Sequence, residues 1–152
     1  AIETSGHCAL RENFFLDDGA FLVAKLIVQA ARMRKDGKEL QDLISSLQQP
    51  AESVEVRFKV NADDVAEYGQ AVLDRVSTVA PTIDGWKVVC PNYEGVRVSC
   101  TNEDEQGWFL LRKSLHDPVL PLNIESDLNG GVEVIRQKLL EVLKPFDKLT
   151  IM

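Results

Sequence analysis

The strict alternation of residues 54–60 is the feature that most limits how this chain can fold. Apolar and charged side chains alternate through Val-Glu-Val-Arg-Phe-Lys-Val, as in a strand with one buried and one solvent-exposed face. A helix is predicted to follow at about residues 63–79, then strands at 86–90, 95–100, 108–112 and 119–124, and a last helix at about 131–143. This order predicts an α+β domain, in which helices cover one face of an antiparallel sheet.

The first fifty residues follow a different pattern. Residues 18–34 are predicted to form a helix with Asp17 or Asp18 as its capping carboxylate. This helix is apolar on most of its circumference, so other elements must pack against it and bury that surface, as in a layered α/β domain. A second short helix is predicted at 38–47, before a Gln-Gln-Pro linker. We therefore expect the helical end of an α/β domain at residues 1–49 and a complete α+β domain at residues 50–152.

Composition excludes several classes of function. A net charge of −7 argues against binding to nucleic acid or anionic lipid through a general basic field, so any anion site must be local. No stretch approaches the roughly 18 apolar residues of a membrane helix, and a soluble protein without a membrane partner is predicted. The three cysteines are too few and too scattered for a disulfide framework, which indicates reduced, intracellular thiols.

The heptapeptide Arg112–Pro118 interrupts two apolar, strand-like runs and has two interpretations. As an anion site, Arg112 donates two parallel hydrogen bonds to a phosphate, Lys113 adds charge, and Ser114 adds a hydroxyl beside the backbone amides of the turn. As a plain turn, Ser114 and Asp117 satisfy backbone groups and the proline fixes the exit. The residue types alone leave both interpretations open.

A second polar cluster, Glu3-Thr4-Ser5-Gly6-His7, combines a carboxylate, two hydroxyls and an imidazole. Such groups suit the recognition of sugar hydroxyls with an ionisable group alongside, and an ordinary loop is the alternative. One histidine and one glutamate make a poor metal site, and Asp17-Asp18-Gly19 lacks the alternating oxygen ligands of a calcium loop. No metal site is therefore expected in this chain.

Two ordered motifs resemble a known family. Glu3-Thr4-Ser5-Gly6-His7, followed by Glu12-Asn13-Phe14-Phe15 and Asp17-Asp18-Gly19, is similar to the sugar-recognition loop and following helix of the α-D-phosphohexomutases, the phosphoglucomutase/phosphomannomutase family. Glu94-Gly95-Val96-Arg97-Val98 and then Gly107–Ser114 resemble the fourth domain of that family, including its phosphate loop. The resemblance covers nearly the whole chain.

The resemblance implies a four-domain enzyme, of which residues 1–49 are the end of domain three and residues 50–152 are domain four, with a TATA-binding-protein-like fold. In such enzymes a phosphoserine donates its phosphoryl group to a hexose phosphate, the hexose bisphosphate reorients, and the other phosphate returns to the serine, with the help of Mg²⁺. The implied partners are hexose phosphates, hexose bisphosphates and the N-terminal domains of the same chain. The expected location is cytoplasmic, with an organelle such as a plastid as the alternative.

The family also implies roles for individual residues. Glu3 and Ser5 are expected to bind ring hydroxyls, and His7 to handle a proton or orient the substrate, with a structural role as the alternative. Arg112, Lys113, Ser114 and His116 are expected to bind the phosphate that is not reacting.

Departures from the family qualify these expectations. Leu115, His116 and Asp117 replace the usual Gly-Thr-Glu, so His116 would contribute an imidazole where the family has a hydroxyl. The sequence contains neither the serine loop nor the metal loop of the family, so this chain is expected to be inactive alone. Two alternatives follow: a non-catalytic phosphosugar-binding or regulatory module, and a piece of a phosphoglucosamine mutase.

Overall fold

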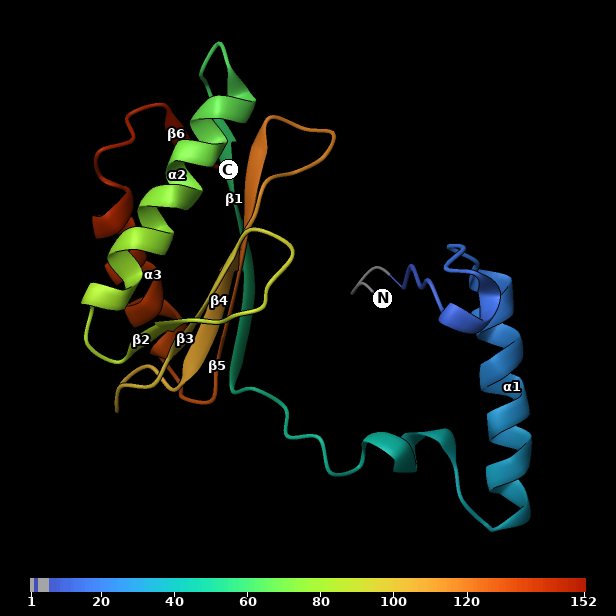
Figure 1. Cartoon of the computed structure of the whole chain (residues 1–152). Helices are drawn as coiled ribbons and strands as arrows, with labels where there is room; N and C mark the ends of the chain where they lie inside the picture. Colours follow the sequence, from blue (N-terminus) through green and yellow to red (C-terminus); the bar gives the residue numbers. More distant parts are fainter. Residues whose placement is uncertain (1, 3–5) are drawn as a thin grey trace. The chain divides into compact units, whose positions relative to one another are not determined.

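The computed structural model of the chain describes Ile2 and residues 6–152 and divides into two compact units, Ala1–Gln48 and Gln49–Met152 (Figure 1). Each unit has its own secondary structure and is described by itself. Within the described residues, no helix has the length and apolar character needed to cross a membrane.

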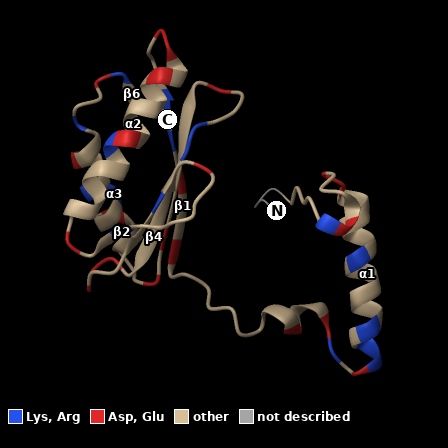
Figure 2. Cartoon of the chain, viewed as in Figure 1, with Lys and Arg blue, Asp and Glu red and all other residues tan. Residues whose placement is uncertain are grey.

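Helix α1, Gly19–Lys35, is the main element of the first unit and confirms the helix predicted there. Asp18 is its N-cap, because Oδ1 of Asp18 accepts a hydrogen bond from the amide of Phe21 at 3.0 Å. This bond, together with one from the side chain of Asn13, lowers the pKa of Asp18. Lysine and arginine side chains occupy the last turn (Figure 2), where positive charge is favourable beside the negative end of the helix dipole.

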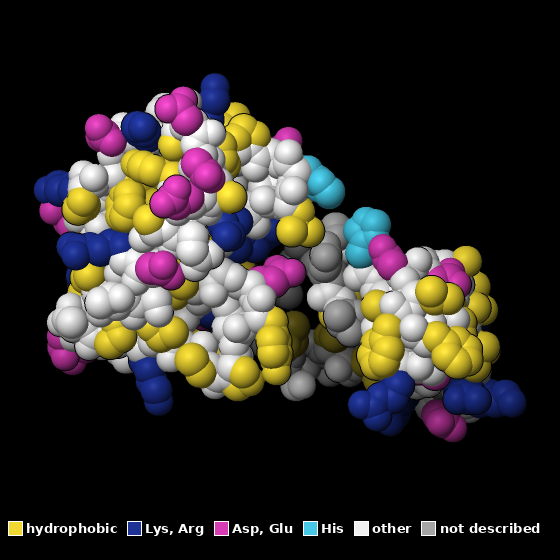
Figure 3. All heavy atoms as spheres, turned by 45° about the horizontal axis from the view of Figure 1, so that its top comes forward, with side chains coloured by type: hydrophobic (Ala, Val, Ile, Leu, Met, Phe, Trp, Pro, Cys, Tyr) yellow, Lys and Arg dark blue, Asp and Glu magenta, His cyan; other side chains and the backbone are white. Residues whose placement is uncertain are grey.

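Much of the apolar surface of α1 is exposed. Val23, Leu26, Ile27 and Val28 have between 44% and 64% of their surface accessible, and exposed apolar side chains gather over the first unit in Figure 3. Contiguous apolar surface of this kind is unusual on a self-contained protein and is typical of a contact surface.

The prediction of a second helix at residues 38–47 is wrong. The structure has only a five-residue 3-10 helix, η2, at Leu40–Ile44, and a shorter one, η1, at Arg11–Asn13 before α1. The apolar residues Leu43, Ile44 and Leu47 are exposed. A segment of about ten residues is shorter than the roughly 12–15 residues that a helix needs when it does not pack an apolar face, so it gains little by extending.

The second unit is an antiparallel sheet with two helices on one face, as Figure 1 shows, and it confirms the predicted α+β fold. The strand order is β2-β3-β4-β5-β1-β6. The strands are β1 Glu52–Val60, β2 Trp86–Val88, β3 Val96–Cys100, β4 Gly107–Leu111, β5 Val119–Ser126 and β6 Leu149–Ile151. The helices are α2 Val65–Val79 and α3 Gly131–Leu143, with the 3-10 helix η3, Ala80–Thr82, after α2.

The core of this unit lies between the sheet and the two helices. On β4 and β5 the alternate residues Phe109, Leu111, Leu122 and Ile124 are fully buried. Each such side chain contributes about 1.5–3 kcal/mol through the apolar surface that it removes from water. The residues between them in sequence point to the opposite, helix-free face of the sheet, because side chains alternate along a strand.

Strand β6 was not predicted from the sequence. It has only three residues, Leu149–Ile151, and pairs with the end of β1 from Phe58 to Val60. A run this short has no readable alternation, so its strand character depends on the neighbour that the fold supplies.

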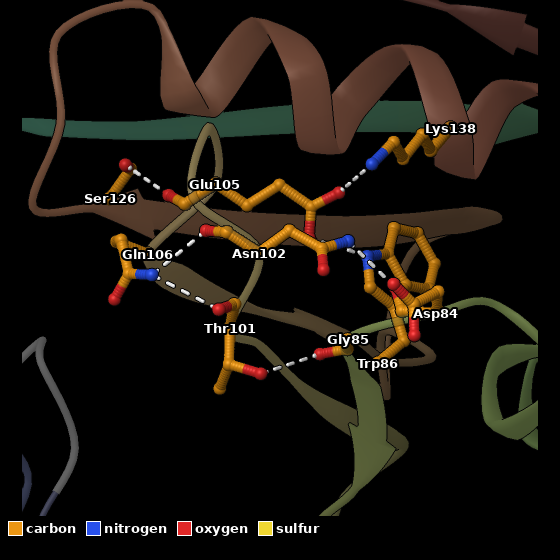
Figure 4. A network of polar contacts seen from close by, with 9 residues as sticks. All are labelled: Asp84, Gly85, Trp86, Thr101, Asn102, Glu105, Gln106, Ser126 and Lys138. Atoms are coloured by element: carbon orange, nitrogen blue, oxygen red, sulfur yellow. Dashed lines mark hydrogen bonds and ion pairs between the residues drawn. The ribbon is translucent and has the colours of Figure 1, made fainter.

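One charged side chain, Glu105, is completely buried in the second unit (Figure 4). Its carboxylate accepts a hydrogen bond from Nε1 of Trp86 at 2.8 Å and is paired with the ammonium group of Lys138. Its backbone carbonyl accepts a hydrogen bond from Oγ of Ser126 at 2.6 Å. The bond to Glu105 raises the pKa of Lys138, and burial, with the nearby Glu105 charge, raises the pKa of Cys100 to about 12.

Candidate functional site

The loop of residues 112–118 joins β4 to β5 and continues their pairing as far as Ser114 and Val119. The amide of Arg112 donates to the carbonyl of Pro121 at 3.1 Å, and the amide of Ser114 donates to the carbonyl of Val119 at 3.0 Å. Leu111 is buried on the helix face, so Arg112 points to the helix-free face. The loop thus holds Arg112 at the edge of an ordered ladder.

Ser114 organises the tip of this loop. Its Oγ accepts hydrogen bonds from the amides of His116 at 3.4 Å and Asp117 at 3.2 Å, the arrangement of a serine turn. In this geometry the hydroxyl oxygen, as an acceptor, and both amides serve the loop itself. Leu115 and His116 at the tip are exposed.

Lys113 lies away from its neighbour Arg112. Its Nζ donates to Oε1 of Gln70 on α2 at 2.9 Å. Its side-chain carbons pass so close to Gly69 that a Cβ added there would lie 3.3 Å from Cδ of Lys113. Successive residues of an extended backbone point to opposite faces, so Lys113 is directed to the helix side while Arg112 is directed to the open side.

The backbone of Arg112 is in close contact with the turn before β3. Gly95 has φ +61°, and a Cβ there would lie 2.1 Å from the carbonyl oxygen of Leu111 and 2.7 Å from Cα of Arg112. Only glycine fits such an approach. The Glu-Gly-Val-Arg motif therefore has a physical role in placing Arg112.

A cluster of polar side chains lies near Arg112 on the helix-free, open face of the sheet. This cluster was not predicted from the sequence. Glu55 accepts hydrogen bonds from Nε of Arg57 at 2.7 Å and from Nδ2 of Asn123 at 3.3 Å. The bond from Arg57 is the main cause that lowers the pKa of Glu55; burial opposes it, and the bond from Asn123 and the charge of Arg112 add to it. The alternation of β1 predicts that Glu55 and Arg57 lie on the solvent-exposed face. It does not predict the pairing of β1 with β5, which brings Asn123 opposite Glu55.

In the first unit, His7 is paired with Asp17. Nδ1 of the imidazole lies 2.6 Å from Oδ2 of Asp17, and Oδ1 of the same carboxylate accepts the amide of Cys8 at 3.1 Å. The carboxylate therefore orients the ring, as it does for many histidines with a chemical role. Of the two candidate caps for α1, Asp17 serves His7 and Asp18 serves the helix. The predicted sugar-binding residues Glu3 and Ser5 lie outside the described residues.

The residues predicted to bind phosphate are thus only partly brought together. Arg112, Ser114 and His116 belong to one loop, whereas Lys113 is directed to α2. Among the described residues, no three His, Cys, Asp or Glu side chains converge in a way that could hold a metal ion.

Comparison with known proteins finds similarity in sequence and in fold. The chain is 26% identical over 144 residues to a phosphoglucomutase of Neisseria gonorrhoeae, a match that covers 93% of this chain and 28% of that protein. It has the fold of a phosphoglucomutase/phosphomannomutase family protein from Burkholderia thailandensis, with a TM-score of 0.65, 24% identity, and coverage of 95% of this chain and 27% of that one.

The chain therefore spans less than a third of the length of either relative. No family model matches it. The resemblance that the two motifs indicate is nevertheless confirmed: over nearly its whole length the chain is similar in sequence to a phosphoglucomutase and in fold to a protein of the phosphoglucomutase/phosphomannomutase family.

Proposed function

We propose that this chain is the C-terminal portion of a phosphoglucomutase/phosphomannomutase-like enzyme, in which it recognises the hydroxyl and phosphate groups of hexose phosphates. The observation that carries the proposal is the loop of residues 112–118, which holds the half-buried Arg112 and Ser114 and the exposed His116 together in a chain similar to a phosphoglucomutase. Binding energy collected at such a site, remote from the reacting bond, positions the phosphoryl group for transfer.

In this proposal Arg112 is the principal phosphate ligand. Its guanidinium has the fork geometry that donates two parallel hydrogen bonds to phosphate oxygens. Ser114 holds the shape of the turn and adds its O–H as a donor, and His116 adds an imidazole N–H from the tip. Lys113 is bonded to Gln70 and acts at most through its charge.

The first unit would supply the sugar loop. Glu3 and Ser5 are proposed to bind ring hydroxyls, with His7 held in place by Asp17. The exposed apolar side chains of α1 support the proposal that further chain completes this unit as part of a third domain. The phosphoserine and the Mg²⁺ ligands are proposed to lie elsewhere in the parent protein, because the sequence given contains neither the serine loop nor the metal loop of the family.

Replacement of Arg112 by glutamine is expected to weaken the binding of glucose 1,6-bisphosphate about tenfold or more, because hydrogen bonds to charged groups contribute about 1.5–3 kcal/mol each. The measurement is an NMR titration of the chain in which amide shifts of residues 112–116 are followed. Affinity is expected to be weak even in the unchanged chain, since the other domains supply part of the contact surface.

The matched control for this variant is Arg75→Gln, which removes an exposed arginine from α2. It is expected to bind like the unchanged chain. If the bisphosphate leaves the amides of residues 112–116 unmoved in the unchanged chain, the phosphate-binding proposal is refuted and the plain-turn interpretation of the loop is left.

His7→Gln in the full-length parent is expected to lower kcat by about 10²-fold or more if the imidazole transfers a proton in the reaction. The Asp17 carboxylate that orients the ring motivates this role. Steady-state kinetics and circular dichroism of the same variant separate chemistry from folding. A variant that keeps the turnover of the parent would leave His7 with a structural role only.

The alternative, a non-catalytic phosphosugar-binding or regulatory module, shares the phosphate site and differs in the rest of the parent protein. The presence of the serine and metal loops in the same gene would favour the enzyme, and their absence would favour the non-catalytic module. A phosphoglucosamine mutase parent would be separated from a glucose or mannose enzyme by comparing turnover of the three hexose phosphates.

A further inference from the structure

The helix-free face of the sheet carries arginines on neighbouring strands. On β1, Phe58 and Val60 are buried, so Arg57 and Lys59 point to the open face. Arg112 points to the same face, because Leu111 before it is buried. This face has no helix over it in the second unit (Figure 1).

Register places Arg57 and Arg112 in one row across the sheet. Arg57 is the partner of Pro121 on β5, and the carbonyl of Pro121 accepts the amide of Arg112 at 3.1 Å. Their backbones are therefore two strand spacings apart, about 10 Å. The residue between them is a proline, whose compact ring carries no charge. Pro121 is itself buried, and two arginine side chains at this separation can reach a single anion held between their guanidinium groups.

Glu55 fixes the orientation of Arg57. Its carboxylate accepts Nε of Arg57 at 2.7 Å and is itself held by Nδ2 of Asn123 at 3.3 Å. Arg57 donates this bond through Nε. Its two terminal amino groups have no hydrogen-bond partner among the described residues. The charge of Arg112 acts on the Glu55 carboxylate, but its guanidinium makes no hydrogen bond to the described part of the chain. Both forks can therefore donate to a ligand.

The charge of this face differs from that of the whole chain. The face also carries Lys59, Lys87 and Arg97, the last lying over the ring of Trp108 at 4.6 Å, against the carboxylates Glu55 and Glu125. The chain as a whole has a net charge of −7. A locally positive face on an acidic protein concentrates anions at that face alone.

We propose that Arg57 is a second phosphate-binding residue, which forms with Arg112 a two-arginine clamp on the open face of the sheet. The inference rests on the proposed function, because it adds a ligand to the same anion site. Glu55 and Asn123 are positioning residues that hold the guanidinium of Arg57 by its Nε. The site takes a phosphate monoester dianion, whose charge two guanidinium groups match.

The test is a titration of the chain with glucose 1,6-bisphosphate and, separately, with inorganic phosphate, followed by NMR. Arg57→Gln is expected to weaken the binding of both about three- to tenfold, since it removes charge-assisted hydrogen bonds at a half-exposed site. Arg57→Lys keeps the charge without the fork and is expected to bind with intermediate affinity. The Nε–Hε resonance of Arg57 is expected to shift on addition of either compound.

Arg136→Gln is the matched control, because Arg136 is paired with a glutamate, Glu133, at 2.7 Å but lies on α3. It removes the same charge and the same kind of ion pair, and its affinity is expected to stay within twofold of the unchanged chain. Equal weakening by both variants would show a general charge effect and overturn the clamp.

The outcomes also separate this inference from the proposed function. If Arg112→Gln weakens binding and Arg57→Gln does not, Arg57 is no phosphate ligand while the proposed function stands. If neither compound shifts any resonance near Arg112 in the unchanged chain, the proposed function and the clamp both fail. Dispersed amide spectra of the variants show that each one is folded.

Discussion

Glu105→Ala is expected to lower the free energy of unfolding of the second unit by about 2–4 kcal/mol, because it leaves a buried cavity and an unsatisfied indole N–H, while the Lys138 side chain, 36% exposed, can turn to water. The change takes away the acceptor of the Trp86 indole N–H and the partner of the Lys138 ammonium group. It also leaves a cavity at a position that has no exposed surface. A buried donor without an acceptor adds its own desolvation cost.

Urea unfolding followed by tryptophan fluorescence measures this loss, since both tryptophans of the chain, Trp86 and Trp108, lie in the second unit. The control is Glu103→Ala, two residues away in the same turn and exposed, which is expected to change stability by about 0.5 kcal/mol or less. A Glu105 variant within 1 kcal/mol of the unchanged chain would contradict a structural role for the buried network.

The contrast between these two glutamates shows where sequence reasoning stops. Residues 103–105 read as three acidic residues in a polar turn, and nothing local says which of them is buried. Glu105 is buried because β2 and α3 bring Trp86 and Lys138 to it from positions 19 and 33 residues away. Alternation, by contrast, is a local signal, and through residues 54–60 it correctly predicted strand β1.

Some residues of the candidate site were likewise predicted from local patterns, and others depend on the pairing of distant strands. Arg112 and Ser114 were found through a motif, and the opposite direction of Lys113 follows from the alternation of an extended backbone. Arg57 was seen only as a polar residue of a strand. Arg57 lies in the same row as Arg112 because β1 pairs with β5, between β5 and β6. This pairing joins residues more than sixty positions apart, and local sequence patterns do not contain it.

Gly95→Ala is expected to lower the free energy of unfolding by about 2–4 kcal/mol, from the strain of a left-handed residue and from overpacking. The new Cβ would lie 2.1 Å from the carbonyl oxygen of Leu111 and 2.7 Å from Cα of Arg112. Because the backbone there must shift, the amide resonances of Arg112 and Ser114 are expected to move, and phosphate binding is expected to weaken with them. Urea unfolding and the phosphate titration measure the two effects.

Gly130→Ala separates the two contributions to this loss. Gly130 also has a positive φ, +87°, but a Cβ there meets nothing within 4 Å. Its replacement should therefore cost only the backbone strain, about 1–2 kcal/mol, and should leave the phosphate affinity unchanged. If the two alanine variants lost equal stability and bound phosphate equally well, the contact of Gly95 with Arg112 would have no part in positioning the site. A larger loss at Gly95, accompanied by weaker binding, ties the Glu-Gly-Val-Arg turn to the placement of the phosphate ligand.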